Sequence, residues 1–120
     1  MDTYRSSALD YQSDNGKAIV VQNGFYFLYS QLTFLVPQHE PHHARTVTHS
    51  IYRERHGHLS KLFHASESVG NTDVAPTNVT TYVGGAVYLR SGDRAMVKSY
   101  SHQWILLSVH SNFFGIFKVS

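Results

Sequence analysis

The sequence contains no cysteine. This absence excludes a disulfide scaffold, a zinc site with thiolate ligands and a cysteine nucleophile. Charged residues make up only 15% of the chain, against about 25% in an average globular domain. A surface with so little charge often has part of its area covered by a partner. The net charge of +2 with neutral histidine is too small for a nucleic-acid groove or a polybasic membrane tail, so neither partner is expected.

Long apolar stretches are also missing. The longest one, Gly24 to Val36, is interrupted by Ser30, Gln31 and Thr33, and it is shorter than the roughly 20 residues that a membrane-spanning helix needs. The N-terminus lacks the apolar region of a signal peptide. With 120 residues, the chain is long enough for one core, and we expect a single domain over residues 1–120.

Signatures of catalysis are missing as well. The sequence has no GxSxG elbow and no GxGxxG or GxxxxGK loop, and none of its 8 acidic residues lies inside an apolar strand. We therefore expect neither an enzyme nor a cofactor.

What the chain has in abundance is residues that favour strands. Val, Ile, Thr, Tyr, Phe and Trp together account for one third of it. Turn signals such as Asn15-Gly16, Asn23-Gly24 and Gly57 recur about every ten residues. Residues 67–78 are rich in Ser, Gly, Asn, Thr and Pro and are predicted to form a surface loop. The pattern predicts seven or eight short strands in an antiparallel sandwich or jelly roll.

Two of the predicted strands are apolar on both faces. These strands are residues 24–34 (GFYFLYSQLTF) and residues 112–119 (NFFGIFKV). A facing sheet covers one face of such a strand, so a second apolar face indicates a self-association surface. In a third strand, residues 79–90, the pair Gly84-Gly85 predicts a bulge or the close approach of another backbone.

Histidine is the one residue type that could indicate a metal. Histidines are concentrated between positions 39 and 64, and on a strand His56 and His58 would share a face. Such a cluster can bind zinc or copper, but no acidic residue is placed to support a ligand, so no metal site is predicted. The triplet Asn78-Val79-Thr80 is a glycosylation sequon, which matters if the chain is extracellular.

Three of these segments resemble the tumour necrosis factor ligand superfamily, in family order and spacing. Residues 24–34 are similar to its Gly-aromatic-Tyr strand, residues 81–94 (TYVGGAVYLRSGDR) to its Tyr-x-Gly-Gly strand and Gly-Asp turn, and residues 112–119 to its C-terminal Phe-Phe-Gly strand. Within the superfamily, residues 47–54 (VTHSIYRE) and the opening Asp-Thr-Tyr are most similar to Fas ligand, LIGHT and lymphotoxin.

The resemblance implies a jelly-roll domain that forms a homotrimer. Family domains begin with a strand upstream of the first motif here, so we expect an incomplete inner sheet, with any membrane anchor further upstream. The residues that the resemblance places at the trimer interface are Phe27, Tyr29, Gln31, Tyr82, Gly84, Phe113 and Gly115.

The resemblance also implies an extracellular cytokine that clusters receptors of the tumour-necrosis-factor-receptor family in the grooves between protomers. At the position where the family usually presents a tyrosine, this chain has His58. The expected receptor contacts are His56, Gly57, His58 and Leu59, the segment His102, Gln103, Trp104 and Ile105, and the N-terminal Thr3, Tyr4 and Arg5. Two alternatives stay open, a trimeric C1q-type module that binds glycans or protein patterns and a histidine-dependent metal-binding protein.

Overall fold

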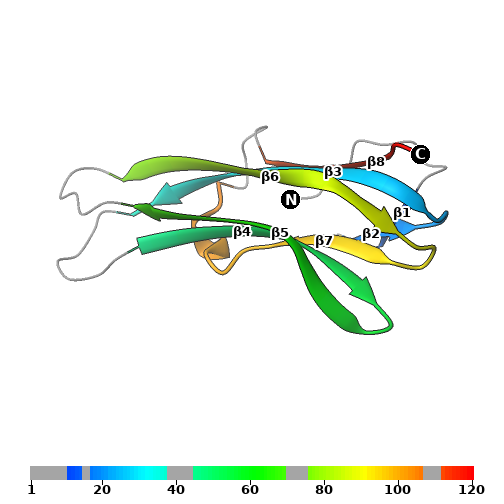
Figure 1. Cartoon of the computed structure of the whole chain (residues 1–120). Helices are drawn as coiled ribbons and strands as arrows, with labels where there is room; N and C mark the ends of the chain where they lie inside the picture. The colour runs from blue at the N-terminus through cyan, green and yellow to red at the C-terminus, as the bar shows by residue number, and fades with distance from the viewer. Residues whose placement is uncertain (1–10, 15–16, 38–44, 70–75, 107–111) are drawn as a thin grey trace.

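The chain folds into two antiparallel β-sheets that face each other (Figure 1). The computed structural model describes residues 11–14, 17–37, 45–69, 76–106 and 112–120. One sheet has the strand order β1-β2-β7-β4-β5 and the other the order β6-β3-β8. This arrangement confirms the predicted all-β jelly-roll sandwich. The elements are β1 (Tyr11–Asp14), β2 (Lys17–Val20), β3 (Gly24–Val36), β4 (Arg45–Arg55), β5 (His58–Val69), β6 (Thr77–Leu89), β7 (Arg94–Lys98), the 3-10 turn η1 (His102–Trp104) and β8 (Phe113–Lys118).

The core lies between the two sheets, and β3 supplies much of it. Every second side chain of β3 is buried, including Tyr26, Leu28 and Phe34. They pack toward apolar residues of the larger sheet such as Val47 and Ile51 of β4. Full burial of a side chain of this size stabilises a fold by about 1.5–3 kcal/mol. The smaller sheet has three strands in the described part of the chain.

The two glycines inside β6 allow neighbouring atoms to approach that strand closely. Pairing between β3 and β6 runs without a register shift from Gly24 opposite Leu89 to Val36 opposite Thr77. A Cβ at Gly84 would lie 2.8 Å from the carbonyl oxygen of Leu28. A register shift does occur in the pairing of β4 with β5, where Ile51 and Tyr52 pair with Phe63 and Lys61 and no glycine marks the irregularity.

The prediction of a surface loop over residues 67–78 was wrong at both ends. Strand β5 continues to Val69, and β6 already begins at Thr77. The polar run Ser66 to Ser68 pairs with residues 46–48 of β4 and is exposed because β5 is the edge of its sheet. The polar composition of this run is therefore that of an exposed edge strand and does not indicate a loop.

The turn between β4 and β5 also differs from expectation. His56 and Gly57 both have positive φ, 52° and 79°, and Arg55 pairs with His58 across them. This is the two-residue turn that suits the twist of a hairpin. His56 therefore lies in the turn and His58 begins β5, so the two do not share a strand face.

Candidate functional site

The outward side of the smaller sheet carries a continuous aromatic surface. Because side chains alternate along a strand, the residues of β3 that do not enter the core point away from the sandwich. They meet outward residues of both neighbouring strands, so that Phe27 lies opposite Phe117 and Gln31 lies between Tyr82 and Phe113. We call this surface the aromatic face; it comprises Phe25, Phe27, Tyr29, Tyr82, Tyr88, Phe113 and Phe117.

Tyr29 is at the centre of the aromatic face. Its ring centroid lies 5.9 Å from that of Phe113 and 6.2 Å from that of Phe117. In the strand register Tyr29 stands between Gly84 and Gly115. A Cβ at Gly115 would overlap the Tyr29 ring, so the ring can lie over β8 only because this position is glycine.

Much of the aromatic face is open in the single chain. Tyr82 is 56% exposed and Phe25 49%. All the residues predicted at the trimer interface lie on this outward side of the smaller sheet, where the strand register makes them neighbours. The prediction omitted Phe25, Tyr88 and Phe117, although alternation along the same strands places them on the same side.

The tip of the β4–β5 hairpin is held by one buried carboxylate. Asp93, 2% exposed, accepts two hydrogen bonds from the Arg55 guanidinium, at 2.8 and 2.7 Å, and one from the Arg90 backbone N–H at 2.8 Å. Burial raises the pKa of Asp93, but the Arg55 and Arg90 hydrogen bonds and the nearby positive charge outweigh burial and hold it below its usual value. This anchor fixes the base of the tip, where His56, Gly57, His58 and Leu59 are exposed.

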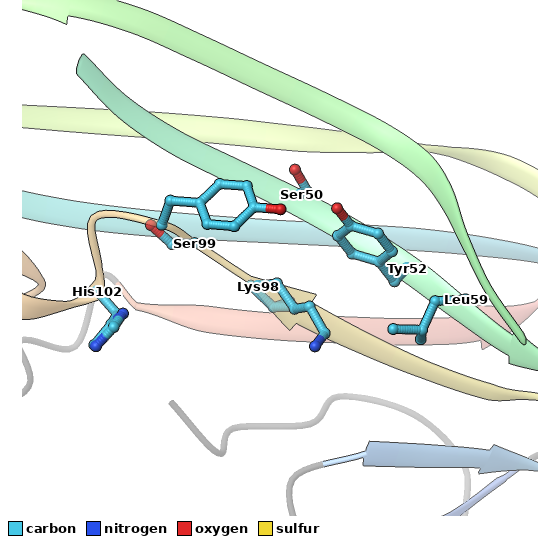
Figure 2. Close-up of a pocket in the computed structure, with 8 residues that line it drawn as sticks. Ser50, Tyr52, Leu59, Lys98, Ser99 and His102 are labelled. Carbon is cyan, nitrogen blue, oxygen red and sulfur yellow. The ribbon is translucent and has the colours of Figure 1, made fainter. Parts of the chain in front are cut away.

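A second surface feature lies on the outward side of the larger sheet (Figure 2). It is a cavity of about 640 Å³ between β4, β5 and the end of β7. Leu59 and His102, from two separate predicted contact segments, both line it. We call it the outer-sheet pocket; its lining residues are Ser50, Tyr52, Leu59, Val97, Lys98, Ser99, Tyr100 and His102.

The segment after β7 divides into an exposed and a packed half. His102 and Gln103 are exposed, whereas Trp104 and Ile105 are half-buried against the core. Ile105 forms an isolated bridge with Phe34 of β3. Thr3, Tyr4 and Arg5, the remaining predicted contacts, lie outside the described residues.

Between the sheets, His49 forms a buried polar network. Its Nε2 lies 2.9 Å from the Ser30 hydroxyl and its Nδ1 lies 2.9 Å from that of Thr81. The Ser30 hydroxyl donates its proton to the Phe113 carbonyl, so its oxygen must accept the proton of Nε2, and Thr81 then donates to Nδ1. Burial lowers the pKa of His49 to about 4, the Thr81 backbone partly opposes this, and the nearby His64 adds to it.

The other histidines do not converge. His64 bonds Ser50 on the outward side of the larger sheet, at 2.6 Å, whereas His49 is buried between the sheets. The described residues contain no group of three or more potential side-chain ligands that could hold a metal ion. His39, His42 and His43 lie outside the described residues.

Asn78 of the sequon was predicted to lie in a loop, but it lies inside β6. It is exposed and pairs with Leu35, so it shares the side of the sheet that carries the aromatic face. Glycosylation of Asn78 stays a prediction, and a glycan there would extend from the end of that surface.

No helix in the described part of the chain is long and apolar enough to cross a membrane. A family model described as the TNF (Tumour Necrosis Factor) family matches residues 2–119. This match does not favour the C1q-type alternative. A comparison with curated proteins finds no match.

Proposed function

The chain belongs to the TNF family, and from this premise we propose that it is an extracellular homotrimeric cytokine that binds and clusters receptors of the TNF-receptor family. Three identical subunits present three identical receptor sites. Simultaneous occupancy brings receptors together, and multivalency strengthens the assembly without any new contact. No catalytic step is needed.

The observation that supports a trimer is the aromatic face. Exposed apolar patches beyond a few hundred Å² are rare on monomers and mark interaction sites. Tyr82, Phe25 and Tyr88 are each more than 40% exposed, although other rings of the aromatic face pack against one another. Burial against two further copies would cover them, and obligate interfaces of this kind bury on the order of 2,000 Å² or more.

A matched pair of charge substitutions tests the trimer. Tyr82→Asp places a charge on the aromatic face, and Tyr100→Asp places the same charge on the opposite side of the sandwich, where Tyr100 is 80% exposed. Light scattering during gel filtration is expected to give about three times 13.6 kDa for the wild type and Tyr100→Asp. Tyr82→Asp is expected to be monomeric, because an unpaired charge in a dry interface is costly. A wild-type mass near 13.6 kDa at micromolar concentration contradicts the proposal.

For the receptor contact, we propose the exposed hairpin tip together with His102 and Gln103. Loops held by a rigid scaffold commonly carry recognition, and the Arg55–Asp93 pair holds this one. The half-buried Trp104 and Ile105 anchor the segment that carries His102 and Gln103 to the core.

Binding to a panel of TNF-receptor-family ectodomains by surface plasmon resonance tests this placement. Leu59→Ala is expected to weaken the cognate complex about tenfold, since an interfacial leucine buries more than one methylene group. His58→Ala is expected to weaken it less and with a dependence on pH, because histidine can gain a proton near pH 6. The exposed Ser66 on the same strand provides the control, Ser66→Ala. If the trimer binds no receptor in the panel, the cytokine function is wrong; if both tip variants bind like Ser66→Ala, only the tip is wrong.

A further inference from the structure

We propose that the outer-sheet pocket binds a sulfated saccharide. The pocket lies on the side of the sandwich opposite the aromatic face, so it stays accessible when that face is covered. Its volume of about 640 Å³ falls within the range of small-molecule sites, about 300–1,000 Å³.

The charge of the pocket is positive and uncompensated within its lining. Lys98 lines it, and Lys61 stands beside it on β5; each ammonium lies 5.9 Å from the Tyr52 ring centroid. None of the lining residues is acidic. Glu54, which shares the outward side of β4 with Tyr52, is engaged by Lys17 at 3.6 Å and Arg94 at 3.9 Å.

The cations at the pocket can bind a tetrahedral anion. Lysine acts as a compact point charge with rotatable donors, which suits sulfate or phosphate oxygens approached from several directions. The two ammonium groups beside the Tyr52 ring can contact one sulfate group, or two neighbouring sulfate groups of the same ligand.

The apolar part of the pocket favours a ring-shaped ligand. Tyr100 is 80% exposed, and its backbone is held by a 2.8 Å hydrogen bond from its N–H to the Thr48 hydroxyl. Leu59, 48% exposed, lines the pocket near the hairpin tip, and His102 of η1 also lines it (Figure 2). The C–H face of a sugar ring can stack on an exposed tyrosine while its sulfate groups meet the ammonium groups. An acidic peptide would use the charge but leave the Tyr100 ring without a matching surface.

Sulfated saccharides are available to an extracellular protein, so the physiological meaning of the site rests on the proposed function. Binding itself needs no receptor and is measurable on the purified protein. The two proposals can therefore fail separately.

Isothermal titration calorimetry with a heparin-derived sulfated tetrasaccharide tests the site, with the desulfated tetrasaccharide and an oligoglutamate peptide as comparison ligands. The wild type is expected to bind the sulfated sugar measurably, and the other two at least about tenfold more weakly. The double variant Lys61→Ala/Lys98→Ala is expected to lose about tenfold in affinity, because each exposed ion pair contributes a few-fold. Arg90→Ala is the control that removes a positive charge away from the pocket, since Arg90 is exposed on the turn between β6 and β7, and it is expected to change affinity less than twofold.

Substitutions at Tyr100 separate stacking from charge. Tyr100→Ala is expected to weaken binding several-fold, whereas Tyr100→Phe keeps the ring and the affinity. The proposal is overturned if the sulfated sugar does not bind, if Arg90→Ala weakens binding as much as the double lysine variant, or if oligoglutamate binds as tightly as the sugar. Equal binding by Tyr100→Ala and the wild type overturns it as well, since the ring would then have no part in recognition.

Discussion

Acidification is expected to weaken the fold through the one histidine that bridges the two sheets. His49 has no exposed surface, and its pKa is lowered to about 4, mainly by burial. In the unfolded chain the same imidazole has an ordinary pKa of about 6.5. The unfolded state therefore takes up the proton first as the pH falls. The stabilising contribution is fully present above about pH 6.5 and is lost between that value and about pH 4.

The size of the loss follows from these two values. At pH 5 the unfolded imidazole is almost fully protonated and the folded one almost fully neutral, which gives a loss of about 2 kcal/mol per chain. Below pH 4 the loss levels off at about 3 kcal/mol. A loss of about 2 kcal/mol lowers the melting temperature of a domain of this size by the order of 5–10 °C.

The surroundings of His49 are otherwise neutral. Ser30 of β3 and Thr81 of β6 offer hydroxyl groups, and β8 contributes the Phe113 carbonyl through Ser30. His64 of β5 is the one neighbour with a coulombic effect on His49, and that effect also lowers the pKa of His49. No carboxylate is among the groups that shift the pKa of His49, so protonated His49 gains no ion pair from them.

Urea unfolding followed by the fluorescence of Trp104, at several values between pH 7.5 and pH 5, measures the effect. The comparison is His49→Gln, which keeps a donor and an acceptor but does not titrate. The variant is expected to be less stable at pH 7.5 and to show a much smaller decrease on acidification. If wild type and His49→Gln lose the same free energy of unfolding between pH 7.5 and pH 5, the reasoning is refuted.

Three further predictions concern single side chains. Phe114→Ala removes a ring that is 1% exposed and is expected to cost about 3–5 kcal/mol, read from urea unfolding; a loss below 1 kcal/mol would contradict its place in the core. Gly115→Val is expected to displace the Tyr29 ring and reduce the trimer fraction in light scattering, and an unchanged mass would argue against Tyr29 at the interface. Arg55→Ala is expected to raise the pKa of Asp93 toward its usual value, because the charged hydrogen bonds are lost; stability that Asp93 contributes is lost as the pH falls through its folded pKa, so acid unfolding should begin at a higher pH. Carboxyl titration by NMR checks the last change, and an unmoved Asp93 pKa would show that the remaining hydrogen bond from Arg90 outweighs burial without Arg55.

The sequence alone determined the aromatic face. Strict alternation along β3 and β8 puts one apolar set toward the core and leaves a second set outside, whatever the facing sheet contains. A run such as GFYFLYSQLTF therefore predicts both a buried and an associating surface. The resemblance to the family predicts that Tyr29, Gly84 and Gly115 share one surface, and the strand register places them side by side.

Tertiary structure alone decided which polar residues are buried and which surface residues meet. Nothing in the spacing of the histidines separates His49 from His64, because burial depends on Ser30 and Thr81 arriving from two other strands. The polar end of β5 resembles a loop in composition, and only its pairing with β4 makes it a strand. Leu59 and His102 line one pocket because β7 pairs next to β4. Local pattern determines how a strand divides its faces, whereas long-range pairing determines what each face contacts.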